Sequence, residues 1–347
     1  MRGIMRTAVL LTLFFGSLSA SVAQTNPNLQ TYFKDYIGLN DEQIAAIRGG
    51  RAFAKNLHSR MADEIFVFGA VYINATPESY LRFAQDFNRL RSVPGFLAIG
   101  EFSEPPQLSD LNALTLDNED VKEFKDCKPG DCKIQLPASS IEDVHRLVDW
   151  FQPSAEEELD ELVRKKVLEH VINYQRKGNE VLGVYNDKRN PTEVPEQFKY
   201  MLSYSKALPK YLPDFYNYLL SYPADEPANV ENSFYWAKVK FGLKPTLRVV
   251  HVLTLHGDAG TEPVYAIAEK QLYSSHYFQT ALDLTFCVRD TTGPQATGFY
   301  LIKTLGSEQS GLTGFKGSIV RKVATDRSSS SLQKSLSAIK EALERGD

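Results

Sequence analysis

The most regular hydrophobic pattern of the chain lies in its last third. Between residues 245 and 305, four apolar-rich runs are separated by turn residues. In the first run, from Leu247 to Leu255, one set of alternating residues is apolar except for His251, which is the spacing of a β-strand with one strongly apolar face. The connections between runs are too short for crossover helices, so the pattern predicts an antiparallel meander.

Turn chemistry divides this meander. Residues 263–288 keep a strand pattern for longer than an ordinary strand of roughly 3–10 residues. We therefore expect the chain to reverse once within them, at residues 274–277. Residues 257–260 and 293–294, which are rich in glycine and contain a Gly-Pro pair, predict two further reversals.

After residue 311 the apolar spacing becomes helical. Two apolar stripes follow each other: Leu312, Phe315, Ile319 and Val323, then Leu332, Leu336, Ile339 and Leu343. Because a helix turns by about 100° per residue, the nine-residue step between the stripes puts them roughly half a turn out of phase. The sequence therefore predicts a kink or break near residues 326–331.

The first 222 residues add strands and then helices. Residues 51–57, 64–74 and 96–102 have strand patterns, and the second is apolar on both faces, which is typical of a covered strand. Thr76 and Pro77 are a typical N-cap and first residue of a helix. From residue 139 to 222 the period is helical, and the end of this block is dense in tyrosine. Packing of short helices onto the sheet is the preferred interpretation of this segment, and a lid over an apolar pocket is the alternative.

This element order predicts an α+β fold. We expect a curved antiparallel sheet wrapped around a long C-terminal helix, with a helical insertion in the middle of the chain. Residues 24–347 would form a single domain, with the insertion at about 139–222 and the meander plus helix at about 232–345.

The N-terminus predicts export. Arg2 and Arg6 precede an apolar run at residues 8–15, and residues 21–23 are small, as in a cleavable signal peptide. A membrane anchor is the alternative, but the run is shorter than the roughly 20 residues needed to span a bilayer. We expect cleavage near Ala23, a periplasmic or secreted location, and no transmembrane segment in the mature chain.

Charge and cysteine content fit an exported protein. The chain has 39 Lys and Arg against 43 Asp and Glu, so it lacks the basic excess of nucleic-acid-binding proteins. Cys127 and Cys132 flank a Pro-Gly turn, which favours a local disulfide in an oxidising compartment. This spacing matches neither a haem attachment motif nor a redox motif. Cys287 lies on a predicted strand, where a buried free thiol is expected.

Sequence signatures of catalysis are absent. The chain contains no G-x-S-x-G, H-E-x-x-H, phosphate-loop or EF-hand motif. The acidic run at residues 117–120 lacks the spacing of a calcium loop, so a solvated helix start is the preferred interpretation. The six histidines show no metal-ligand spacing on a predicted helix. We therefore expect no metal and no cofactor.

The order of elements over residues 51–102 and 234–345 resembles the START or SRPBCC superfamily, which has the helix-grip fold. That resemblance implies a ligand cavity between the sheet and the C-terminal helix. Residues 234–236 and 270–278 also resemble segments of exported bacterial proteins of unknown function, a likeness that implies no activity.

Three functional hypotheses remain. The first is a non-enzymatic binder of an apolar small molecule or lipid, with a set of polar or amphipathic contacts at Tyr235, Trp236, Tyr273, His276 and Lys303. The second is a cyclase- or hydrolase-type enzyme that uses His276 or His251 as general base, oriented by a tyrosine. The third is a structural protein without a cavity. For both histidines, a structural role with bonds to the backbone is the alternative.

Overall fold

The computed structural model describes residues 27–93, 95–240, 244–257, 262–290 and 298–346. Within them, eight strands build one antiparallel sheet and two short strands pair separately. The strands of the main sheet are β1 (Phe53–Asn56), β2 (Glu64–Ile73), β3 (Phe96–Glu101), β6 (Val230–Lys240), β7 (Pro245–His256), β8 (Tyr265–Ser274), β9 (Phe278–Arg289) and β10 (Phe299–Gln309). The separate pair is β4 (Val184–Tyr185) and β5 (Thr192–Glu193).

The predicted meander is confirmed as β7 to β10. The strand order is β1-β2-β10-β9-β8-β7-β6-β3, so the N-terminal strands extend the meander at both edges and the sheet is not closed. The chain reverses between β8 and β9 where the sequence predicted it, and Tyr277 in this turn has a positive φ of 65°. Nearly all of β2 is buried on both faces, as its continuous apolar run predicted.

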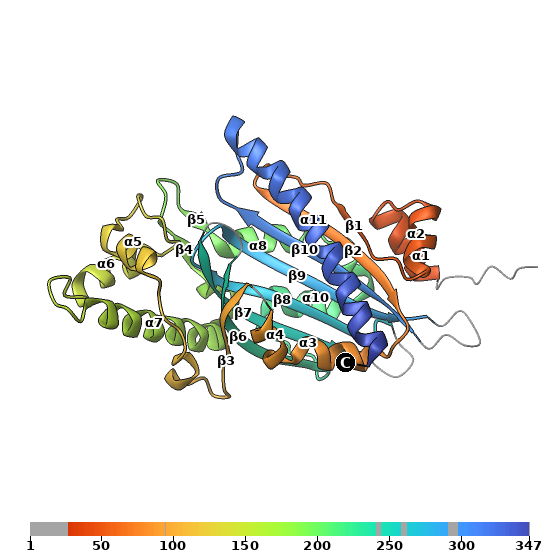
Figure 1. The fold of residues 1–347 in the computed structure, drawn as a ribbon, viewed down its shortest axis with the longest axis horizontal. Helices are drawn as coiled ribbons and strands as arrows, with labels where there is room; N and C mark the ends of the chain where they lie inside the picture. Colours follow the sequence, from red (N-terminus) through yellow and green to blue (C-terminus); the bar gives the residue numbers. More distant parts are fainter. Residues whose placement is uncertain (1–26, 94, 241–243, 258–261, 291–297, 347) are drawn as a thin grey trace, which may run out of the picture.

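The helices cover both faces of the sheet. The α-helices are α1 (Pro27–Thr31), α2 (Asp41–Arg48), α3 (Pro77–Gln85), α4 (Phe87–Ser92), α5 (Asn118–Asp126), α6 (Ala138–Leu147), α7 (Ala155–Lys177), α8 (Val194–Leu202), α9 (Leu208–Tyr211), α10 (Pro213–Ser221) and α11 (Gly314–Arg345). Shorter turns are η1 (Tyr32–Tyr36), η2 (Leu108–Leu111) and η3 (Gly178–Leu182). In Figure 1, α11 crosses one face, whereas α8 and α10 lie behind the sheet.

The break predicted in the C-terminal helix is wrong, because α11 runs without interruption from Gly314 to Arg345. Leu332 and Leu336 are buried on β2, where their side chains occupy the space above Gly69. Ile319 and Val323, in contrast, are exposed. The two stripes therefore do not have to face the same surface. An uninterrupted helix can bury the second stripe on the sheet while Ile319 and Val323 of the first stripe stay exposed.

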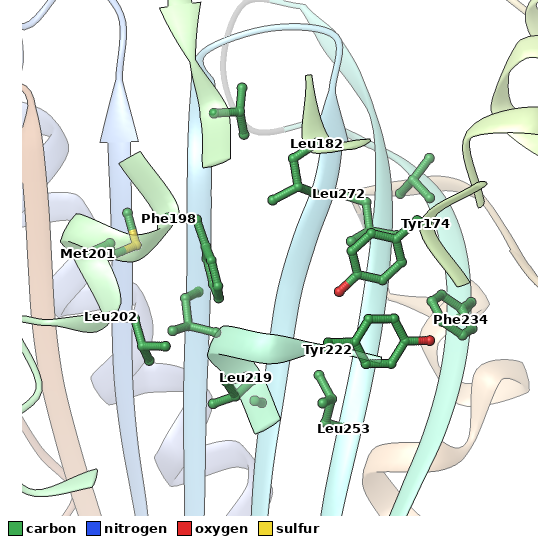
Figure 2. Close-up of a cluster of buried hydrophobic side chains, with 14 of the residues drawn as sticks. Tyr174, Leu182, Phe198, Met201, Leu202, Leu219, Tyr222, Phe234, Leu253 and Leu272 are labelled. Carbon is green, nitrogen blue, oxygen red and sulfur yellow. The ribbon is translucent and has the colours of Figure 1, made fainter. Parts of the chain in front are cut away.

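The central helices and the opposite face of the sheet enclose the largest hydrophobic cluster. Figure 2 shows Tyr174 of α7 and Tyr222 after α10 beside Phe234 of β6. The two tyrosine rings stack with centroids 4.9 Å apart and planes 12° apart. The tyrosine-rich end of the helical block is thus core packing at these positions.

Two predictions about the cysteines are confirmed. Cys127 and Cys132 form a disulfide with Cα atoms 4.5 Å apart. Cys287 is a buried free thiol on β9, and burial raises its pKa. Among the described residues, no helix is long and apolar enough to cross a membrane. The predicted signal peptide (1–23) and the turn residues 258–260 and 293–294 lie outside the described residues.

Candidate functional site

A buried polar centre lies where α5 meets the β8–β9 turn. Asp120 and Glu123, three residues apart on α5, are 5% and 7% exposed, and His276 of the turn is 5% exposed. One potential ligand atom from each residue lies within 4.8 Å of the other two. The interpretation of residues 117–120 as a solvated helix start is therefore wrong for Asp120, although the neighbouring Glu119 is exposed.

Both ring nitrogens of His276 have polar partners. Nδ1 lies 3.1 Å from the carbonyl oxygen of Lys133, and Nε2 lies 3.1 Å from Oδ1 of Asp120. Because a carbonyl oxygen only accepts hydrogen bonds, Nδ1 carries a proton and donates it. Lys133 directly follows Cys132, so the disulfide constrains the segment that presents this carbonyl to His276.

Two lysines contact the same centre. Lys244 forms an ion pair with Oε1 of Glu123 and another with Glu119 at 3.0 Å. Lys133 approaches Oε1 of Glu123 to 3.6 Å. The other carboxylate oxygen of Glu123, Oε2, is buried and has no hydrogen-bond partner. One acceptor in this centre is therefore left unsatisfied.

A second polar network lies inside the core between α7 and the sheet. His251 of β7 is fully buried, and its Nδ1 is 3.1 Å from the hydroxyl of Tyr174. Its Nε2 is 2.8 Å from Oδ1 of Asn232, an oxygen that only accepts. Nε2 therefore carries the proton, and Nδ1 accepts from Tyr174. Burial, aided by the charge of Lys270, lowers the pKa of His251 well below its usual range.

Lys270 of β8 completes this core network. Its Nζ donates to the Tyr174 hydroxyl at 3.0 Å and to Oδ1 of Asn179, and lies 4.0 Å from the centre of the Phe198 ring. Burial lowers the pKa of Lys270 well below its usual range and raises that of Tyr174. Burial therefore disfavours the charged form of this lysine.

The lowered pKa of Lys270 predicts a pH dependence of stability. Between the lowered pKa of the folded protein and the usual value near 10.5, the unfolded chain binds more protons than the folded one. The free energy of unfolding should therefore rise with pH over this window, by up to about 1.4 kcal/mol per pH unit. We expect Lys270→Met to lose this contribution to the slope. Urea unfolding at several pH values measures it.

Replacement of an exposed lysine on the same side of the molecule provides the control. Lys177, the last residue of α7, is exposed, and Lys177→Met removes one positive charge without touching the core. Its pH slope should match that of the unmodified protein. Equal slopes for the unmodified protein and Lys270→Met would show that folding does not lower the pKa of Lys270.

Three cavities lie on the face of the sheet that is opposite α11. The smallest, of about 110 Å³, is the apolar pocket, lined mainly by Leu29, Leu208, Leu212, Val288 and Ile302. The α7 pocket, of about 230 Å³, is lined by His170, Lys166 and Asn173 of α7 and by residues of the sheet such as Tyr273. The largest, of about 540 Å³, lies beside the apolar pocket and shares Tyr32, Ala207 and Phe286 with it.

The largest cavity combines two kinds of lining and is called the amphipathic pocket here. Its apolar lining includes the buried side chains of Phe66, Leu282 and Leu284 from the sheet. The polar lining includes Arg60 and Lys206, both exposed, and also Asp35. Lys206 directly precedes Ala207, which lines both this pocket and the apolar pocket.

Arg60 is held in place by aromatic residues in and directly after α8. Its guanidinium carbon lies 3.7 Å from the centre of the Tyr200 ring, and Nη2 donates to the Tyr200 carbonyl at 2.6 Å. Tyr204 stacks on Phe66 with centroids 4.5 Å apart. The aromatic segment thus shapes one side of the amphipathic pocket. No motif in the sequence singled out Arg60, Lys206 or Ala207.

The five predicted ligand contacts do not come together. Successive residues of β6 point to opposite faces, so Trp236 lies in the core beneath the central helices while Tyr235 lies on the α11 face. Trp236 donates to the carbonyl of Asp110 at 2.9 Å. Tyr273 lines the α7 pocket, and His276 belongs to the buried centre on α5.

Lys303 lies on the α11 face with Tyr235 in a mostly covered group of charges. Its Nζ is 3.4 Å from the Tyr80 hydroxyl, and Tyr235 donates to Glu269 at 3.3 Å. Burial opposes the charge of Lys303, but attraction to Tyr80, Glu269 and Asp283 outweighs it and raises the pKa. Burial raises the pKa of Asp283 to about 6.

The sequence was also compared with known proteins. No family model and no curated protein matches this chain. Membership in the helix-grip superfamily therefore stays a prediction from the order of elements, and function has to be argued from the sites themselves.

Proposed function

We propose that the protein binds an amphipathic small molecule, with an apolar body and an anionic head, in the amphipathic pocket. The observation that carries the proposal is one cavity of about 540 Å³ with buried apolar side chains from the sheet and exposed Arg60 and Lys206 among its lining. This volume is in the range of small-molecule sites, roughly 300–1,000 Å³. The apolar pocket beside it offers room for the end of a longer chain.

The binder hypothesis thus keeps its ligand class but moves to another part of the molecule. The helix-grip resemblance implied a cavity between the sheet and the C-terminal helix. The three cavities described above lie on the opposite face, and on the α11 face the side chains of Leu332 and Leu336 occupy the space above Gly69 of β2. The disulfide supports a site of action outside the reducing cytoplasm.

Binding is favoured over acid–base catalysis by the positions of the two histidines. His251 and His276 each have hydrogen-bond partners at both ring nitrogens, and neither lines one of the three cavities. A general base has to reach the proton that it removes. The amphipathic pocket needs no such group to hold a ligand.

A paired-ligand titration tests the proposal. We expect dodecanoate to bind to the full chain more tightly than dodecanol, because only the carboxylate can pair with Lys206; Arg60 already has an ion pair with Glu64 at 3.6 Å. Ala207→Trp, which fills the junction of the two pockets, should weaken both ligands at least tenfold. Ala113→Trp, at an exposed position on a different loop, is the matched control and should leave both unchanged. Isothermal titration calorimetry measures the affinities.

The contribution of the Lys206 charge is tested separately. Lys206→Gln should weaken dodecanoate severalfold and leave dodecanol unchanged, because the lysine supplies charge and not apolar contact. If neither ligand binds, and native mass spectrometry of the purified full chain detects no bound amphiphile, the proposed function is wrong. If dodecanol binds as well as dodecanoate, the anionic head is the part to be abandoned.

A further inference from the structure

We propose that Asp120, Glu123 and His276 bind one divalent cation of the zinc type. The proposal is independent of the amphipathic pocket, whose lining shares none of these residues. The three side chains come from two segments about 150 residues apart in sequence, and their potential ligand atoms converge within 4.8 Å. One imidazole nitrogen and two carboxylate oxygens are ligands that Zn²⁺ accepts.

The state of the imidazole is the first argument. Its Nδ1–H donates to the Lys133 carbonyl. In the neutral ring, Nε2 therefore carries a lone pair that points toward Oδ1 of Asp120, 3.1 Å away. Two acceptors at this distance repel each other unless a proton or a cation lies between them. Metal-bound histidines characteristically donate their other nitrogen to a carbonyl or carboxylate, which is the role of Lys133 here.

The unsatisfied oxygen of Glu123 is the second, independent argument. This side chain is 93% buried, and its Oε2 has no hydrogen-bond partner although Oε1 is paired with Lys244 and Lys133. Leaving a buried carboxylate oxygen without a partner is costly. A cation bound by Oε2 would satisfy it and leave the ion pairs of Oε1 in place.

Charge and geometry are compatible with a divalent ion. Asp120, Glu123 and the nearby Glu119 carry three negative charges, against two positive charges on Lys133 and Lys244. Ligands at about 2.1 Å around a tetrahedral ion are about 3.4 Å apart. The widest pair, at up to 4.8 Å, has to close by at most about 1.4 Å, which a glutamate side chain can do by rotation.

Metal titrations of the full chain test this site. After chelator treatment and removal of the chelator, we expect the full chain to take up one equivalent of Zn²⁺, and Co²⁺ to give visible absorption bands. Asp120→Asn and His276→Gln should each weaken Zn²⁺ binding at least tenfold. His256→Gln, at a partly exposed histidine on β7, is the control and should bind as the unmodified protein does.

Two results would overturn the proposal. One is the absence of stoichiometric Zn²⁺ uptake, which would mean that a proton alone joins His276 to Asp120. The other is unchanged binding in His276→Gln. If a variant fails to fold, ¹¹³Cd NMR of the unmodified chain decides instead: a single bound signal coupled to one imidazole nitrogen supports the site, and its absence excludes it. Neither readout depends on a ligand in the amphipathic pocket.

Discussion

Gly178→Ala is expected to remove most of the folding stability of this protein. Gly178 ends α7 with a positive φ of 67°, and its backbone lies against that of Tyr222. A Cβ atom at this position would overlap the Tyr222 carbonyl oxygen, which belongs to the backbone and cannot rotate away. Relief requires α7 and the end of α10 to separate, and with them the stacked rings of Tyr174 and Tyr222. We expect a loss above about 4 kcal/mol.

Gly183→Ala separates the steric effect from backbone strain. Gly183 has a similar φ of 81°, but the nearest atom to an added Cβ is 3.8 Å away. Only the cost of the left-handed backbone remains, about 1–3 kcal/mol. Urea unfolding of both variants, followed by circular dichroism, makes the comparison. Equal losses for the two variants would mean that α7 and α10 do not pack as closely as described.

Leu336→Ala should cause the second large loss, about 2–5 kcal/mol. Leu336 is fully buried. Its Cδ1 packs so closely on Gly69 that a Cβ atom added to this glycine would lie only 2.8 Å from it. Glycine at this point of β2 lets α11 approach the sheet closely. Truncation of the leucine leaves a cavity that neither the sheet nor a continuous helix can close.

Ile319→Ala on the same helix is the matched control. Ile319 is 58% exposed, and alanine has the higher helix propensity, so the change should be neutral within about 0.5 kcal/mol. Thermal unfolding scans of both variants provide the measurement. A loss at Ile319 as large as at Leu336 would show that the first half of α11 is packed in solution.

The buried centre on α5 shows where reading along the chain failed. Asp120 and Glu123 have the three-residue spacing that places two side chains on one helix face, and this signal was present in the sequence. Their burial was not, because it depends on the β8–β9 turn, which presents His276 from about 150 residues away. A search for histidines at metal-ligand spacing on one helix therefore cannot find a cluster whose residues come from two distant segments.

The amphipathic pocket was missed for a different reason. Aromatic and basic residues such as Tyr204 and Arg60 looked like ordinary surface and packing positions. They line a cavity only because the segment after α8 folds back onto Phe66 of β2. Two of the five predicted contact residues, Tyr235 and Trp236, are neighbours on β6, and their alternating side chains cannot line one site.

Local patterns determined most of the fold. Alternation along β7 to β10, the turn at residues 274–277, the N-cap at Thr76 and the short disulfide loop each depend on interactions within a few residues, so the sequence alone predicts them. Tertiary structure decided the rest: which face α11 covers, that its exposed half needs no break, and which polar side chains meet. Those outcomes depend on contacts between segments that are far apart in the sequence. The hydrophobic periodicity of one segment does not contain the energies of such contacts.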